Sequence, residues 1–186
     1  MATQKKIGFS FEKLSKTSTS RKLGGFDDEV LLCPVEAITT MPTLPEVIAK
    51  EEDKVVATGT FTFADGYSGF RSVMAQSNSV GLTPEIVGPT DSKSYNQKGS
   101  FALAGDSIEN DALMSDFNSY KFIVAIRKGR HYTIIGTLQR PAEISAKPNY
   151  GKKAEDGVVH ECEISCVSDT PALKYAEQIP VATPEA

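Results

Sequence analysis

The sequence predicts a mainly β fold, one antiparallel β-rich domain that carries a single α-helix. The first observation is the run Phe117 to Ile144, the densest stretch of β-forming residues, which a Lys128-Gly129 dipeptide divides. The second is the apolar–polar alternation over Val158 to Val167, which is typical of a strand with one buried face. The third is one helix pattern over Asp106 to Asn118, where the capping residue is followed by Glu109.

The central run predicts a β-hairpin made of Tyr120 to Arg127 and Arg130 to Leu138, with Ile126 opposite His131. Both faces are rich in apolar residues, whereas a sheet that meets water on one side normally carries polar residues there. Each face therefore needs a cover, from another layer of the chain or from a neighbouring subunit. We expect the second face to lie in a subunit interface. The apolar interface candidates are Phe122, Ile123, Val124, Tyr132, Ile134 and Ile135.

The turn of this hairpin carries three cations, Arg127, Lys128 and Arg130, which repel one another at close range. One interpretation is a turn exposed to solvent. The other is a contact point for an acidic patch on a neighbouring subunit, or for a phosphate backbone. The three residues are therefore interface candidates as well.

Shorter patterns predict the remaining elements. Apolar runs favour strands over Glu29 to Val35, Lys54 to Phe63, Phe70 to Gln76 and Ser100 to Ala104. Stretches rich in Pro, Gly and polar residues favour loops over 77–99 and 146–157.

The same patterns divide the chain into three parts. Residues 1–24 are rich in Lys, Ser and Thr, which predicts an extended N-terminal arm that is ordered only in an assembly. Residues 25–176 predict a single β-rich domain. Residues 177–186 contain Pro and predict a flexible C-terminal tail.

The composition is that of an ordinary globular protein with a formal net charge of −4. This balance provides no general basic field that attracts nucleic acid. No apolar run approaches the ~20 residues that span a bilayer, and the N-terminus lacks an apolar core of signal-peptide length. We expect no membrane partner and a chain that stays in the cytoplasm of the cell that makes it.

The side chains most able to carry chemistry are three cysteines (Cys33, Cys162, Cys166) and two histidines (His131, His160). Three of them alternate along one predicted strand, whereas zinc ligands must converge on one point. Cys162 and Cys166 would lie roughly 13 Å apart, beyond the reach of a disulfide. Neither Cys33 nor Cys162 has an evident cationic neighbour that would lower its pKa. We expect no catalytic site, no metal and no cofactor.

Residues 113–175 carry a series of segments whose order can be compared with known families. They are LMSDFNSYK, FIVAIRKG, HYTIIGT, PAEISAKPNYG, AEDG and SDTPALKY, and upstream of them stand Gly24-Gly25, GFRSVMAQS and SFALAGDS. In strand order and turn spacing the chain resembles tail-tube-like virion proteins of phages and prophages, particularly of the Bacteroidetes type.

The resemblance implies an antiparallel β-sandwich or rolled sheet with one flanking α-helix, and a structural protein without an active site. Six subunits would form a ring, and rings would stack into a hollow tube that conducts DNA. The partners would be other copies of the chain, other tail or neck proteins of the virion, and DNA that passes without sequence-specific binding. The protein would be located in the virion tail after synthesis in the host cytoplasm. A mildly acidic chain suits such a channel because it does not hold DNA.

Three other functions remain open from the sequence. The first is a neck or tail-terminator ring protein of the virion. The second is a non-viral β-sandwich binding module of carbohydrate-binding or adhesin type, which needs exposed aromatic side chains; the chain has no Trp, but Tyr67, Tyr95 and Tyr150 fall in predicted loops. The third is an enzyme, for which no convergent set of catalytic residues is evident.

Overall fold

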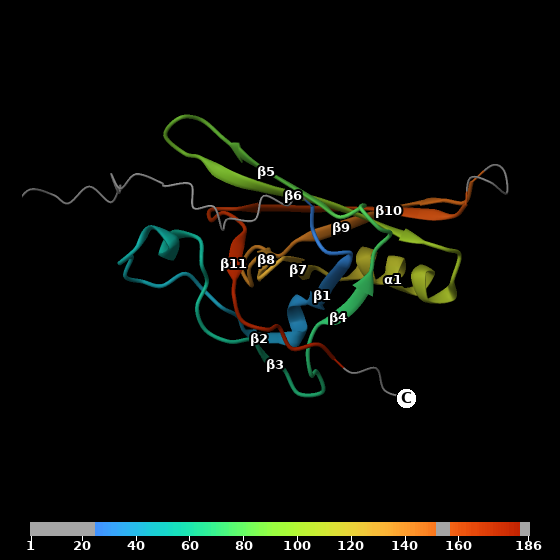
Figure 1. Ribbon diagram of the computed structural model, residues 1–186, viewed down its shortest axis with the longest axis horizontal. Coiled ribbons are helices and arrows are strands. Elements are labelled where there is room, and N and C mark those ends of the chain that lie inside the picture. The colour runs from blue at the N-terminus through green and yellow to red at the C-terminus, as the bar shows by residue number, and fades with distance from the viewer. Residues whose placement is uncertain (1–24, 152–156, 183–186) are drawn as a thin grey trace, which may run out of the picture.

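The computed structural model describes residues 25–151 and 157–182, which form a mainly β fold with antiparallel sheets and one α-helix, as predicted (Figure 1). The inner sheet consists of β1 (Glu29–Pro34), β4 (Arg71–Met74), β7 (Phe122–Lys128), β8 (His131–Ile135) and β11 (Leu173–Tyr175), in the order β11-β8-β7-β1-β4. The outer sheet consists of β5 (Gly81–Val87), β6 (Ser94–Ala104), β9 (Glu143–Asn149) and β10 (Val159–Ser168), in the order β5-β6-β10-β9. The smaller elements are β2 (Ile38–Thr40), β3 (Thr62–Phe63), the 3₁₀ turns η1 (Val35–Ala37) and η2 (Glu51–Lys54), and the helix α1 (Ile108–Ser119).

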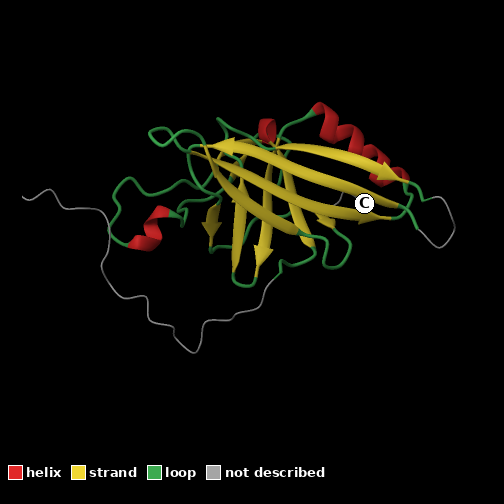
Figure 2. Ribbon diagram, turned by 90° about the horizontal axis from the view of Figure 1, so that it is seen from above, coloured by secondary structure: helices red, strands yellow, loops and turns green. Residues whose placement is uncertain are grey.

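The two large sheets pack face to face with their strands running crosswise, and a first hydrophobic core fills the space between them (Figure 2). The inner sheet contributes residues such as Leu32 and Val124, and the outer sheet contributes Ile164. One open side is closed by α1. The ring of Phe117 packs edge-on against the ring of Phe122, with centroids 5.6 Å apart.

A second hydrophobic core lies on the opposite face of the inner sheet. Residues 37–70 and the C-terminal segment cover this face, and Phe61 is central to the cover. The Phe61 ring lies edge-on to the rings of Phe70, at 4.9 Å, and Tyr175, at 5.8 Å. The chain itself therefore buries the inner sheet on both faces.

This double cover corrects the expected subunit interface. Ile123 and Ile134 are completely buried in the second core, and Val124 and Ile135 are completely buried in the first. Phe122 is also buried, and Tyr132 is partly buried against the second core. The apolar second face of the hairpin is covered by distant segments of the same chain, so its burial requires no neighbouring subunit.

The β7–β8 hairpin forms as predicted, but its register differs by two residues. Ile126 pairs with Thr133, and Lys128 pairs with His131. The turn is therefore Gly129-Arg130, and Gly129 has a φ of +65°. Glycine is favoured where the first turn residue of a two-residue hairpin needs a positive φ. A shift of two residues leaves each side chain on its predicted face.

Three other predicted segments differ from the structure. The strand expected over 54–63 is irregular except for β3, and a φ of +105° at Gly59 interrupts it. The loop expected over 77–99 contains β5 and the first half of β6, and the loop expected over 146–157 begins within β9. β4 forms as expected, but it pairs with β1 and not with the segment before it.

The helix is confirmed, but its cap lies one residue after the predicted Asp106. Ser107 is the N-cap, and its side chain accepts a hydrogen bond from the Asn110 N–H at 3.2 Å. Leu113 and Phe117 face the core, whereas Ile108 is 88% exposed. Among the described residues, no helix has the length and apolar character needed to cross a membrane.

The predicted termini differ in outcome. The expected N-terminal arm, residues 1–24, lies outside the described residues. The described part of the predicted C-terminal tail, residues 177–182, contacts the second core and the segment around Phe70. Ile179 is buried in the second core, and the Phe70 N–H donates to the Pro180 carbonyl at 2.9 Å. A Cβ on Gly69 would approach the same carbonyl oxygen to 2.7 Å, so this site requires glycine.

A carboxylate placed on either face of the hairpin should unfold the protein. Ile134→Asp and Val124→Asp each bury an unpaired charge, at a cost of several kcal/mol, which is a large part of the stability of a typical domain. Circular dichroism and urea unfolding measure the loss. Arg130→Asp, at the exposed turn, is the control and should leave the midpoint nearly unchanged. A folded Ile134→Asp protein that has lost only self-association would restore the interface assignment.

Candidate assembly surfaces

The basic turn of the β7–β8 hairpin is exposed, and two of its three cations contact their own chain. Arg127 Nε lies 3.6 Å from Asp27 Oδ2 and donates a hydrogen bond to the Gly129 carbonyl at 3.2 Å. Lys128 Nζ lies over the Phe26 ring, 5.0 Å from its centroid. Within the described part of the chain Arg130 makes no such contact. Of the predicted interface candidates, these three cations and the partly buried Tyr132 remain at the surface.

The outer sheet presents one polar face to solvent, and the alternation between core and solvent is most regular in β10. In β10, Cys162 and Ile164 are buried while Glu161 and Glu163 are exposed. The charged side chains of this open face in the outer-sheet strands are Glu85, Lys98, Glu143, Lys147, Glu161 and Glu163. Acidic groups outnumber basic ones, and the face therefore carries net negative charge.

The same face carries two ion pairs and has a depression between them. Lys98 lies 3.0 Å from Glu85, and Lys147 lies 3.4 Å from Glu163. A depression of about 390 Å³ opens between these pairs, where small residues such as Gly81 are found. Exposed ion pairs of this kind stabilise the fold little, so the pattern mainly sets the charge of the surface.

The two edges of the outer sheet are unpartnered. Within the described residues, β5 pairs with β6 alone and β9 pairs with β10 alone. All three ladders of the sheet are antiparallel, so β5 and β9 run in opposite directions. An open edge presents a row of free N–H and C=O groups to which another strand can pair.

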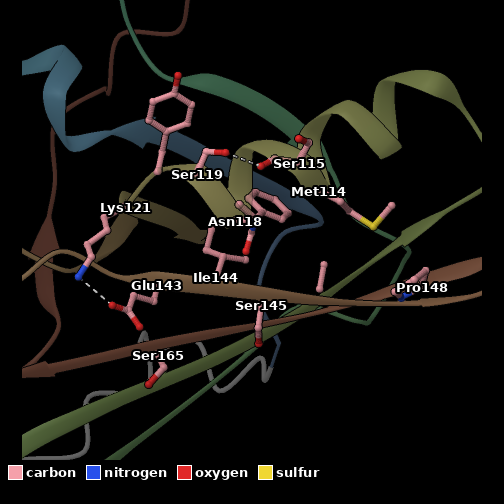
Figure 3. Close-up of a pocket in the computed structure, with 13 residues that line it drawn as sticks. Met114, Ser115, Asn118, Ser119, Lys121, Glu143, Ile144, Ser145, Pro148 and Ser165 are labelled. Carbon is pink, nitrogen blue, oxygen red and sulfur yellow. Dashed lines mark hydrogen bonds and ion pairs between the residues drawn. The ribbon is translucent and has the colours of Figure 1, made fainter.

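A groove of about 740 Å³ lies between the second half of α1 and β9; we call it the α1–β9 groove (Figure 3). Phe117 and Ile144 form part of its wall. Lys121 Nζ lies 2.8 Å from Glu143 Oε1, and this pair links the segment after α1 to the start of β9. The hydrogen bond between them raises the pKa of Lys121 and lowers the pKa of Glu143.

Sequence reasoning missed this groove and both sheet edges. β5 and most of β9 fell in predicted loops, because each contains a proline and several polar residues. The signal present in the sequence was the alternation Leu82, Pro84, Ile86, which is weak because only two of these residues favour strands.

The thiols and imidazoles occupy separate places in the fold. Cys33 lies in the second core, while Cys162 and Cys166 lie in the first. His160 is buried; its Nε2 lies 3.2 Å from the Gly105 carbonyl oxygen, and its Nδ1 has no hydrogen-bond partner among the described residues. The described residues hold no group of three or more His, Cys, Asp or Glu side chains that could bind a metal ion.

The chain matches no protein-family model, no curated protein and no solved structure. The fold class comes from the structure alone, and a proposal for the function depends on the surfaces described above.

The three cysteines should be unreactive in the native protein. Burial raises the pKa of Cys33 and of Cys162 to about 12, and burial also raises the pKa of Cys166. A thiol reagent at pH 8 should label none of them until denaturant is added. Because the raised pKa values favour the protonated thiol in the fold, stability should fall as the pH rises from about 9 toward 12. Rapid labelling of the folded protein would contradict this expectation.

Proposed function

We propose that this protein is a structural subunit of a phage virion, and specifically a tail tube subunit whose copies join into stacked rings around a DNA-conducting channel. The observation that carries the proposal is the outer sheet, which has one open polar face and two edges that run in opposite directions and have no partner among the described residues. The resemblance of residues 113–175 to tail-tube-like proteins supports the same function and a ring of six copies.

Copies set side by side in one orientation bring β9 of one next to β5 of the following copy, which forms an antiparallel ladder. Such a head-to-tail contact closes into a ring when the rotation between copies closes. Each edge contains one proline, Pro84 in β5 and Pro148 in β9, and each proline lacks a backbone donor. Pairing therefore depends on side-chain contacts as well as on backbone hydrogen bonds.

The α1–β9 groove can supply those contacts. Ile86 of β5 alternates with Leu82 on the core-facing side of its strand, yet it is 64% exposed. In the proposed junction Ile86 enters the groove of the next copy and packs against Phe117 and Ile144. Burial of this side chain removes the largest apolar exposure on β5 and favours association.

In this arrangement the open face of each outer sheet lines the channel. Its net negative charge repels a phosphate backbone, so DNA meets no basic surface on which to stop. The hollow centre of the face gives the lining a concave surface. The inner sheet of each copy, with the second core, then lies farther from the channel, toward the outside of the ring.

Replacement of Ile86 by Asp tests the junction. The wild-type protein should form rings or tubes in negative-stain electron micrographs and sediment as an oligomer. Ile86→Asp should fold normally and sediment as a monomer, with association weakened tenfold or more, since burying such a side chain contributes roughly 1.5 to 3 kcal/mol.

The matched control is Ile48→Asp, because Ile48 is 58% exposed and lies outside both edges of the outer sheet. This variant should assemble like the wild type. Wild-type protein that stays monomeric at high concentration, or Ile86→Asp protein that still forms rings, would refute the proposed junction. Rings that never stack would favour a neck or terminator protein over a tube subunit.

A further inference from the structure

A second groove lies where the end of α1 meets the inner sheet, and we call it the tyrosine groove. It encloses about 240 Å³, and Leu32, Leu113 and Phe122 form its buried apolar floor. Tyr67 and Tyr120 also line it and remain exposed to solvent. Because an apolar cavity of about 150 Å³ is enough to bind benzene, the tyrosine groove has room for one aromatic side chain.

The surroundings of the tyrosine groove are mainly acidic. Glu36 and Asp116 line it, and Arg71, which also lines it, lies 4.0 Å from Asp116. α1 carries two further acidic residues in its first turn, Glu109 and Asp111, and its sequence contains no Lys or Arg. A ligand complementary to this groove therefore combines an aromatic side chain with neighbouring cations.

The N-terminal segment of the chain, residues 1–24, has that chemistry. It contains six basic side chains and one acidic side chain, whereas residues 25–186 contain 14 basic and 23 acidic ones. Ile7, Phe9 and Phe11 alternate with other residues, so in an extended conformation they share one side. Lysines stand before and after this apolar stretch.

We propose that the tyrosine groove binds the N-terminal segment of this chain, with a phenylalanine of the pair Phe9 and Phe11 in the groove and the flanking lysines against its acidic surroundings. The described chain begins beside the β7–β8 turn, where the Asp27 N–H donates to the Arg127 carbonyl at 3.0 Å. The stretch between Phe11 and Gly25, about 14 residues, spans up to about 45 Å when extended. The segment can therefore reach the groove of its own copy or of a neighbour, and the contact does not depend on ring formation.

Disulfide trapping in the full-length protein tests this contact. One variant carries Ser10→Cys, between the two phenylalanines, together with Tyr67→Cys at the groove. The matched control carries Ser10→Cys with Tyr150→Cys, because Tyr150 is 57% exposed, close to the 56% of Tyr67, and lies outside the groove. The native cysteines are buried and do not compete. After mild oxidation, mass spectrometry identifies the joined peptides, and non-reducing gels show whether one copy or two are joined.

The cross-linking yield of the variant with Ser10→Cys and Tyr67→Cys should be about tenfold or more above the yield of the control variant. Adding Phe9→Ser and Phe11→Ser should lower this yield by about the same factor, because no aromatic side chain is then left to enter the apolar groove. Adding Asp116→Lys to the trapping variant should lower its cross-linking yield. Added salt should lower the yield of the trapping variant that keeps Asp116. Circular dichroism verifies that each variant is folded. Equal yields at Tyr67→Cys and Tyr150→Cys, or a yield unchanged by the two serine substitutions, would overturn the proposal.

Discussion

Burial of both faces of the inner sheet is the constraint on which the rest of the structure depends. β7 contributes five consecutive buried residues, from Phe122 to Ile126, so neither side of this strand can meet water. One cover is regular, the outer sheet with α1, and the other is an irregular wrap by residues 37–70 and the C-terminal segment. Two unlike covers leave two unlike outer surfaces, and the regular one presents the long edge strands β5 and β9.

A polar contact also fixes the regular cover to the inner sheet. Gln97 of β6 is buried; its Nε2 donates to the Thr170 carbonyl at 2.9 Å, and its Oε1 accepts from the Gly136 N–H at 3.3 Å. Gly136 follows β8, so one side chain connects the outer sheet to the segments that bound β8 and β11. Since a buried amide left unpaired is costly, this contact favours one relative placement of the sheets and hence a defined open face of the outer sheet.

The elements that could be predicted from sequence are those whose patterns are local. β1, β7, β8, β10 and α1 each carry an apolar period or a cap of their own, and each formed within a few residues of its predicted bounds. The segment over 54–63 alternates like a strand, yet its apolar residues serve as single anchors, with Ala57 and Phe61 in the second core. The hydroxyl of Tyr175 donates to the Gly59 carbonyl at 3.0 Å, a contact across more than a hundred residues that no local pattern encodes.

The candidate site was harder to predict for the same reason. The apolar hairpin faces were assigned to an interface because the sequence does not show that residues 37–70 fold back over Ile123 and Ile134. The surfaces now available for assembly consist of strand edges and grooves, and these arise only when distant segments meet. Arg127, Lys128 and Arg130 were identifiable because a charged turn is a local feature.

Charge imposes a requirement that links the two proposals. The chain after residue 24 contains 23 acidic and 14 basic side chains, so copies packed edge to edge repel one another where their surfaces come within about 8 Å at physiological salt. The cations of the β7–β8 turn lie near the start of β1, whereas the acidic surroundings of the tyrosine groove lie near its end. Attraction between the basic end of one copy and the acidic end of the next would favour head-to-tail packing. Pairing of β9 with β5 of the next copy requires the same packing. A basic N-terminal segment seated on acidic α1 would offset the repulsion that the edge contact alone leaves in place.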